Sequence, residues 1–190
     1  MIYLASQSPR RRDLLEQIHI PYQTVTVNID ETPLHHEMPR AYVERMAVEK
    51  ARQAYRPDMQ YPLLAADTSV VCKNRILGKP ANEADFLEMM QLLSNQAHQV
   101  MTAVAVTHSI EAEAVKTCLS VSDVRFRKIN HSEARHYWQS GEPRDKAGGY
   151  GIQGLGAIFI EEIHGSYSGI MGLPLFETAK LLSEFGVYSI

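Results

Sequence analysis

Short apolar runs alternate along this chain with segments of helical periodicity, and together these patterns predict an α/β fold. Residues 2–5 form an apolar run that is typical of a buried strand, and residues 14–18 carry apolar side chains at helical spacing. Ser8 and Pro9 lie between the two segments, and both residue types are favourable at the start of a helix. The sequence therefore predicts a strand that passes directly into a helix.

The rest of the chain repeats this alternation. A polar turn at 109–113 joins two long alternating runs, which we expect to pair as antiparallel strands. Ser132 and Pro174 are each expected to begin a helix. The predicted strands are 22–27, 62–66, 70–72, 76–77, 98–107, 114–126 and 157–160, and the predicted helices are 39–55, 82–93, 132–141 and one that starts at 174.

The run at 62–66 is continuous rather than alternating and ends abruptly at Asp67. Such a run is typical of a strand that is buried on both faces. In open α/β sheets, ligands bind outside the carboxyl ends of these strands. We therefore predict that Asp67 is a catalytic or metal-binding carboxylate at a strand end. The alternative is that it is a surface turn residue.

The segment 5–13 concentrates serine and arginine where the first helix starts. Arg10, Arg11 and Arg12 follow Ser6 and Ser8 within a few residues. Positive charge in a first helical turn opposes the helix dipole, whereas a phosphate bound there is stabilised by it. The cluster therefore predicts a polyanion site, although any single arginine could be a solvated surface charge.

Further basic and acidic residues are candidates for binding the polyanion or a cation. Lys79 is held between Gly78 and Pro80, so its backbone is restricted. Carboxylates suit a hard cation or the activation of water, and serine, lysine and arginine suit phosphate. The candidate phosphate ligands are Ser6, Ser8, Arg10, Arg11, Lys50 and Lys79, and the candidate carboxylates are Glu31 and Asp67. The residues thus predict metal-dependent chemistry on a nucleotide or another polyphosphate, without indicating which bond breaks.

The glycine-rich segment 145–156 contains the letters of a dinucleotide-binding fingerprint at 149–154. That fingerprint requires a strand before it and a helix after it. Here the sequence predicts a helix and a polar turn before the segment and a strand after it. We therefore reject a dinucleotide fold for this chain. We expect instead a loop whose backbone N–H groups, together with Gln153, approach a ligand closely.

Composition narrows the class of protein. The chain has 190 residues, 45% of them apolar, which suits one domain, and its net charge of −3 argues against a nucleic-acid partner. Cys72 and Cys118 lie in apolar runs and indicate buried thiols in a reducing compartment. The sequence shows neither a secretory signal nor an apolar run long enough to span a bilayer, so we expect a cytoplasmic protein without a membrane partner.

Seven short segments together resemble the Maf family of nucleoside triphosphate pyrophosphatases. They occur in the family's order over essentially the full chain. The segments are ASQSPRR at 5–11, EKA at 49–51, ADT at 66–68, GKP at 78–80, DKAG at 145–148, YGIQG at 150–154 and GLPL at 172–175.

The resemblance implies a fold and a reaction. The fold would be a single elongated α/β domain over residues 1–190, with a mixed, curved sheet flanked by helices and a cleft between two lobes, as in inosine triphosphate pyrophosphatases. The reaction would be hydrolysis between the α and β phosphates of a nucleoside triphosphate with a divalent cation, Mg²⁺ or Mn²⁺. Family habit also favours a homodimer.

The resemblance also assigns roles to residues. Asp67 would accept the proton of the attacking water, and Glu31 and Asp67 would lie at the metal. The sequence itself does not divide the roles of base and metal ligand between these two carboxylates. The residues that would bind the phosphates are Ser6, Ser8, Arg11, Lys50 and Lys79.

Three positions bear on the base of the nucleotide. Arg10, Thr68 and Gln153 resemble the family's pyrimidine subgroup, which acts on dTTP and UTP. The side-chain amide of Gln153 offers a donor and an acceptor, which suits the imide edge of thymine or uracil.

Two alternatives to a pyrimidine-directed pyrophosphatase remain. One is a purine-directed pyrophosphatase acting on 7-methyl-GTP or inosine triphosphate, and the other is a nucleotide-binding regulator of septum formation with little turnover.

Overall fold

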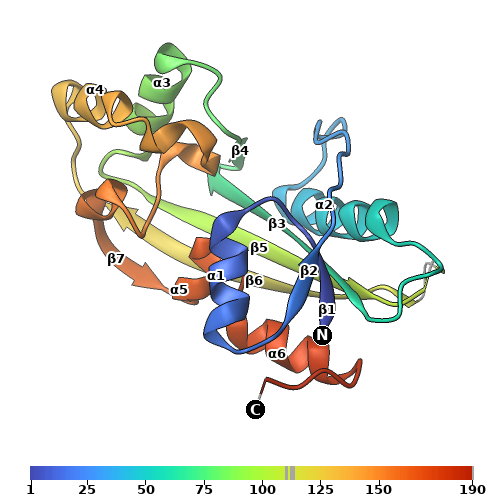
Figure 1. Cartoon of the computed structure of the whole chain (residues 1–190). Helices are drawn as coiled ribbons and strands as arrows, with labels where there is room; N and C mark the ends of the chain where they lie inside the picture. Colours follow the sequence, from blue (N-terminus) through green and yellow to red (C-terminus); the bar gives the residue numbers. More distant parts are fainter. Residues whose placement is uncertain (110, 112–113, 190) are drawn as a thin grey trace.

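The computed structural model of the chain describes residues 1–109, 111 and 114–189, and its centre is one mixed sheet (Figure 1). The strand order is β2-β1-β3-β5-β6-β7, and β4 pairs with β3 outside this path. The strands are β1 (Ile2–Ala5), β2 (Tyr22–Thr24), β3 (Leu63–Cys72), β4 (Arg75–Leu77), β5 (Ala97–Thr107), β6 (Lys116–Phe126) and β7 (Ile160–His164). The predicted mixed α/β sheet is confirmed.

Strand direction changes within this sheet. β1 lies parallel to β2 and to β3, whereas β3, β5, β6 and β7 pair antiparallel in succession. The two long alternating runs therefore pair as predicted, as β5 and β6. Part of the turn predicted at 109–113 lies outside the described residues.

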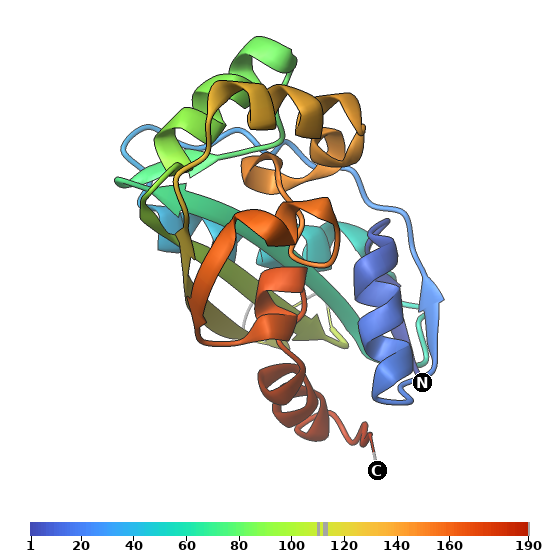
Figure 2. The same cartoon turned by 90° about the vertical axis from the view of Figure 1, so that its left-hand side faces the viewer.

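Helices cover both faces of the sheet (Figures 1 and 2). α2 (Pro39–Ala54) covers one face, where Val43, Met46 and Ala47 pack against alanines of β3 and β5. α1 (Pro9–Gln17), α5 (Tyr167–Met171) and α6 (Leu175–Ser183) contribute to the core on the other face. α3 (Glu83–Leu93) and α4 (His131–Gln139) lie together toward the opposite end from α6 (Figure 2), over an aromatic core with Phe86 and Phe126.

The extent of β3 corrects one prediction. Asp67 lies inside this strand rather than at its end, because β5 continues to pair with it from Leu63↔Thr107 to Val71↔Gln99. On its other side, β1 pairs with β3 only as far as Ala5↔Ala65, and β4 begins to pair only at Val70. Part of one edge of β3, around Asp67, is therefore left uncovered by neighbouring strands.

Several helix starts follow the predicted chemistry, and others differ. Pro9 and Pro39 begin α1 and α2 as predicted, and the Asn82 side chain caps α3 by accepting from the Asp85 N–H. Ser8 occupies the N-cap position of α1, but its side chain makes no capping hydrogen bond. α4 is capped by Asn130 rather than by the predicted residue 132, because Asn130 forms a reciprocal capping box with Glu133.

Two predicted strands are also corrected. The second strand ends at Thr24, short of residue 27. Residues 157–160 were expected to form a strand, but Leu155–Phe159 is a 3₁₀ helix, η4, and β7 begins only at Ile160. Two further 3₁₀ segments, η2 (Glu142–Asp145) and η3 (Ala147–Gly149), lead into the glycine-rich segment. Among the described residues, no helix combines the length and apolar character needed to cross a membrane.

Candidate active site

A single cleft of about 910 Å³ brings the predicted site residues together. Its walls come from the β1–α1 connection, α2, the middle of β3, the segment after β4 and the glycine-rich segment. The ten predicted residues that line it are Ser6, Ser8, Arg10, Arg11, Glu31, Lys50, Asp67, Thr68, Lys79 and Gln153. The cleft opens beside the edge of β3 that β1 and β4 leave uncovered.

The two candidate carboxylates meet at one lysine. Lys50 Nζ lies 2.7 Å from Asp67 Oδ1 and 2.6 Å from Glu31 Oε1. Burial acts to raise the pKa of Glu31, but the hydrogen bond and charge of Lys50, with weaker effects of Lys79 and Arg11, outweigh it and lower that pKa. Glu31 is therefore ionised at neutral pH, and the group presents two carboxylates that share one ammonium.

Arg11 is anchored by three parts of the chain. It donates from Nε to the Gly172 carbonyl at 2.7 Å, from Nη1 to Ser6 Oγ at 3.2 Å and from Nη2 to Thr68 Oγ1 at 3.1 Å. Burial lowers the pKa of this guanidinium, an effect that the Asp67 charge opposes. An arginine stays protonated in proteins, so Arg11 presents a fixed positive charge at the cleft.

Asp67 and Thr68 are neighbours on β3, so their side chains point to opposite faces of the sheet. Asp67 meets Lys50 of α2 on one face. Thr68 meets Arg11 on the other, and its hydroxyl also lies 2.9 Å from that of Thr102. The structure thus places Thr68 next to Arg11, the arginine predicted to bind phosphate, and the Thr68 hydroxyl helps to hold the Arg11 side chain in position.

Arg10 faces the opposite wall of the cleft. Its Nη1 lies 3.7 Å from Asp145 Oδ2, and Asp145 also pairs with Lys146 at 2.7 Å. Asp145 and Lys146 belong to the same glycine-rich segment as Gln153. Arg10 and Gln153, two of the predicted specificity residues, therefore lie on parts of the chain that an ion pair connects.

The glycine-rich segment differs from the prediction in one respect. Its N–H groups were expected to face a ligand, but those of Leu155 and Gly156 donate to the Glu142 carboxylate at 2.8 and 3.1 Å. The Gly151 N–H donates to the Tyr137 hydroxyl at 3.1 Å. These three groups hold the loop, and the Gln153 side chain lines the cleft as a candidate contact to a ligand.

Sequence reasoning also missed the residues that hold Glu31. Tyr42 donates its hydroxyl proton to the Glu31 carbonyl at 2.8 Å, and Arg45 donates to both oxygens of Glu37 and to the Thr32 carbonyl. The sequence signal was weak, since a tyrosine and an arginine on a helix are ordinarily packing and surface residues. Together they fasten the loop that carries Glu31 to α2.

The donor set fits a divalent cation that arrives with phosphate. In the described part of the chain, no group of three or more His, Cys, Asp and Glu side chains is placed to hold a metal ion. Glu31 and Asp67 supply two carboxylates. Mg²⁺ is ordinarily bound through one or two carboxylates with substrate phosphates and water completing its shell. The residues thus suit a cation shared with a polyphosphate.

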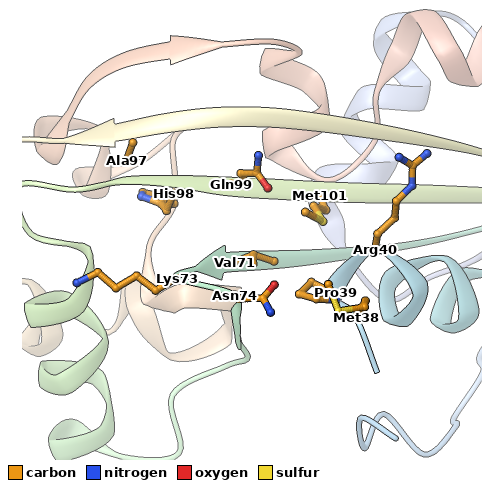
Figure 3. Close-up of a pocket in the computed structure, with 10 residues that line it drawn as sticks. All are labelled: Met38, Pro39, Arg40, Val71, Lys73, Asn74, Ala97, His98, Gln99 and Met101. Carbon is orange, nitrogen blue, oxygen red and sulfur yellow. The ribbon is translucent and has the colours of Figure 1, made fainter. Parts of the chain in front are cut away.

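A second, smaller pocket of about 250 Å³ lies away from this cleft (Figure 3). Val71 and Met101 line it together with Met38 at the start of α2. The Arg40 and Lys73 side chains extend away from each other in Figure 3, so their charges do not converge on one point. The ten predicted site residues belong to the larger cleft.

Comparisons with known proteins agree with this geometry. Residues 1–185 match the model of a family described as "Maf-like protein". The chain is similar to two proteins named dTTP/UTP pyrophosphatase. It is 50% identical to the one from Alkalilimnicola ehrlichii, over 98% of this chain and 93% of that relative. It is 51% identical to the one from Saccharophagus degradans, over 98% of this chain and 89% of that relative. The solved structure of a HAM1 protein from Coxiella burnetii shares the fold, with a TM-score of 0.55, 18% identity, and coverage of 96% of this chain and 98% of that one. Because the family model spans nearly the whole chain and the relatives share about half of its residues, this protein belongs to the Maf-like family.

Proposed function

We propose that this protein hydrolyses dTTP and UTP to the nucleoside monophosphate and pyrophosphate. The observation that carries the proposal is the convergence of Glu31, Asp67 and Lys50 with Arg11 and Lys79 in one cleft. The names of relatives that share about half of its sequence support the choice of reaction and substrate. The cleft volume of about 910 Å³ is also of the size that binds small-molecule ligands.

Phosphate binding is assigned to basic and hydroxyl side chains from three parts of the chain. Ser6, Ser8 and Arg11 lie at the start of α1, and Lys50 and Lys79 come from α2 and from the segment after β4. Charge-assisted hydrogen bonds from these groups would hold the triphosphate and stabilise the charge that develops during phosphoryl transfer.

In the proposed reaction, a water molecule attacks one of the two phosphorus atoms that share the α–β bridging oxygen, and the bond from that phosphorus to the bridging oxygen breaks. Asp67 takes the proton of that water, and pyrophosphate leaves. Glu31 and Asp67 would hold Mg²⁺ or Mn²⁺, which when bound neutralises phosphate charge. Lys50 fixes the positions of both carboxylates before substrate arrives, because it contacts each of them.

Base selection is assigned to Arg10, Thr68 and Gln153. Gln153 lines the cleft and would pair with the imide edge of thymine or uracil. Arg10 would contribute to base selection together with Gln153. Thr68 would contribute indirectly, by holding the Arg11 side chain that it contacts. Two alternatives remain open to experiment: a purine-directed pyrophosphatase, and a nucleotide-binding regulator of septum formation with little turnover.

A panel assay of pyrophosphate release tests the proposal. dTTP, UTP, inosine triphosphate and 7-methyl-GTP are compared, each with Mg²⁺ and with Mn²⁺. We expect the highest kcat/KM on dTTP and UTP. A higher value on either purine nucleotide would support the purine-directed alternative, and the absence of release from every nucleotide would support the regulator.

The variant Asp67→Asn separates an enzyme from a binder, because it removes the base while keeping the shape of the side chain. Loss of general-base catalysis should lower kcat by about 10²- to 10⁴-fold. The dissociation constant for dTTP, measured by calorimetry, should change little by comparison. Asp123→Asn, at a paired position of β6, provides the matched carboxylate control.

Light scattering on the wild-type protein tests the expected homodimer.

A further inference from the structure

Glu142 lies at the centre of the hydrogen bonds that hold the glycine-rich loop. Its carboxylate accepts from the Tyr137 hydroxyl at 2.7 Å, from Leu155 N at 2.8 Å and from Gly156 N at 3.1 Å. The Tyr137 hydroxyl in turn accepts from Gly151 N at 3.1 Å. The loop 151–156 is therefore fastened at both ends to one carboxylate and one hydroxyl, and Gln153 lies between these ends.

Two glycines show how closely these side chains approach the loop. A Cβ atom at Gly154 would collide with a carboxylate oxygen of Glu142. A Cβ atom at Gly156 would lie 2.6 Å from the Tyr137 hydroxyl oxygen. A Cβ atom at Gly154 would therefore displace the Glu142 carboxylate from the loop, and a Cβ atom at Gly156 would also lie 2.8 Å from the Gly151 carbonyl oxygen, so the backbone would have to shift.

The ionised form of Glu142 is the one that these contacts favour. Burial acts to raise its pKa, but the hydrogen bonds from Tyr137, Leu155 and Gly156 outweigh it, and the pKa is lowered. An ionised carboxylate offers acceptors only, which matches a hydroxyl and two N–H donors. An amide in its place would direct an NH₂ group at one of these donors.

The same residue connects to the opposite wall of the cleft. The Glu142 carbonyl accepts from Lys146 Nζ at 3.1 Å, Lys146 pairs with Asp145 at 2.7 Å, and Asp145 pairs with Arg10 at 3.7 Å. Arg10 belongs to α1, so this chain of contacts crosses the cleft. Glu142 therefore joins the loop that carries Gln153 to the arginine that faces it.

We propose that Glu142, together with Tyr137, is a positioning residue for base selection, which sets the place of Gln153 relative to Arg10. This inference rests on the proposed function, because it assumes that Gln153 contacts the base. It assigns Glu142 no role in the chemistry of the phosphates. Its loss should therefore change which base is accepted more than how fast the bound triphosphate is hydrolysed.

The experiment compares dTTP with dCTP, since the two nucleotides carry the same sugar and triphosphate and differ only in the base, at ring positions 3 and 4 and in the 5-methyl group of thymine. In Glu142→Gln, the ratio of kcat/KM on dTTP to that on dCTP should fall about tenfold, the equivalent of about one hydrogen bond. We expect KM for dTTP to account for most of the change. Tyr137→Phe should act in the same direction, and it removes only the hydroxyl group.

A double-variant comparison separates positioning from general loss of stability. In a Gln153→Ala background, where the amide is already absent, Glu142→Gln should change the dTTP to dCTP ratio by less than twofold. Glu133→Gln provides a matched control, because Glu133 belongs to the capping box of α4 and also accepts from Arg127. It should lower the melting temperature without changing the ratio.

The outcomes distinguish this inference from the proposed function. Release of pyrophosphate from dTTP by the wild type, with an unchanged ratio in Glu142→Gln and Tyr137→Phe, would overturn the inference alone. An equal loss of kcat on both nucleotides would also overturn it, because Glu142 would then act on the chemistry. A wild type that is inactive on every nucleotide would overturn both.

Discussion

Lys50 shows how one residue determines the electrostatics of the cleft. Two carboxylates close together ordinarily repel each other, and one of them then takes up a proton. Here the ammonium of Lys50 lies within 2.7 Å of an oxygen of each, and its side chain is only 14% exposed. The hydrogen bond and charge of Lys50 lower the pKa of Glu31 although burial acts to raise it, so this carboxylate stays ionised beside Asp67.

Replacement of Lys50 should change the pKa of Glu31. In Lys50→Gln, the hydrogen bond and positive charge that lower the pKa of Glu31 are lost, while its burial, which acts to raise that pKa, remains. We expect the pKa of Glu31 to rise above its value in the wild type. A ¹³C NMR titration of the carboxyl groups measures this change, and the Glu133 resonance, whose pKa is lowered by Arg127, serves as the unchanged reference. A Glu31 titration that does not move would contradict the role given to Lys50.

At the scale of the elements, the unequal lengths of neighbouring strands create the site. β1 is four residues long and β3 is ten, so the sheet continues on one side of Asp67 after it has stopped on the other. The chain leaves β1 at Ala5 and enters α1 through Ser6 and Ser8 at this point. The phosphate-binding candidates and the candidate base are thereby placed beside each other.

The turn between β3 and β4 provides a test at this scale. Lys73 and Asn74 have φ values of 49° and 63°, which is the combination required by a two-residue hairpin turn of type I′. Lysine is strained in this region, whereas asparagine and glycine tolerate it. Replacement of the pair by Lys73→Asn with Asn74→Gly should raise the free energy of unfolding by about 1 kcal/mol.

Urea denaturation measures this change. Because these two residues line the smaller pocket (Figure 3) and the predicted site residues line the larger cleft, kcat/KM on dTTP should stay constant. A loss of stability in the double variant would mean that the Lys73 side chain contributes more than its backbone strain costs.

At the scale of the whole molecule, the aromatic core that contains Phe126 is linked to the cleft through a buried histidine. His98 is 3% exposed, and its Nε2 lies 2.7 Å from the hydroxyl of Tyr150, a residue that lines the cleft. Its ring also packs edge-on against Phe126. Burial lowers the pKa of His98 to about 4.

This histidine should make stability depend on pH. Below the ordinary pKa of 6.5, the unfolded chain binds a proton at His98 that the folded protein does not bind until about pH 4. The free energy of unfolding should therefore decrease as the pH falls through this window, by about 1.6 kcal/mol between pH 6.5 and 5. The carboxylates with lowered pKa values lose their contribution only below about pH 4.5.

Denaturation at several pH values measures the slope. His98→Gln retains an amide that can hydrogen-bond to Tyr150 but does not titrate, so it should have a smaller slope between pH 6.5 and 5 whatever its absolute stability. An equal slope in the variant and the wild type would assign the pH dependence to other groups.

The sequence by itself determined most of the elements and singled out the candidate site residues. Apolar periodicity, proline positions and the Asn82 cap depend on local physics, so they were readable without a structure. The seven short segments identified the family because their residue types and order are specific together. All ten candidate site residues do line one cleft.

Only the tertiary structure decided how those residues are held. Asp67 was predicted at a strand end, but pairing with β5, in which Ala103 lies opposite Asp67, extends the strand past it. The loop N–H groups were predicted to face a ligand, but Glu142 and Tyr137 take up three of them. Such contacts join residues that are distant in the sequence or ordinary in type, and no local pattern records them. They form because buried polar groups must find partners once the chain has packed.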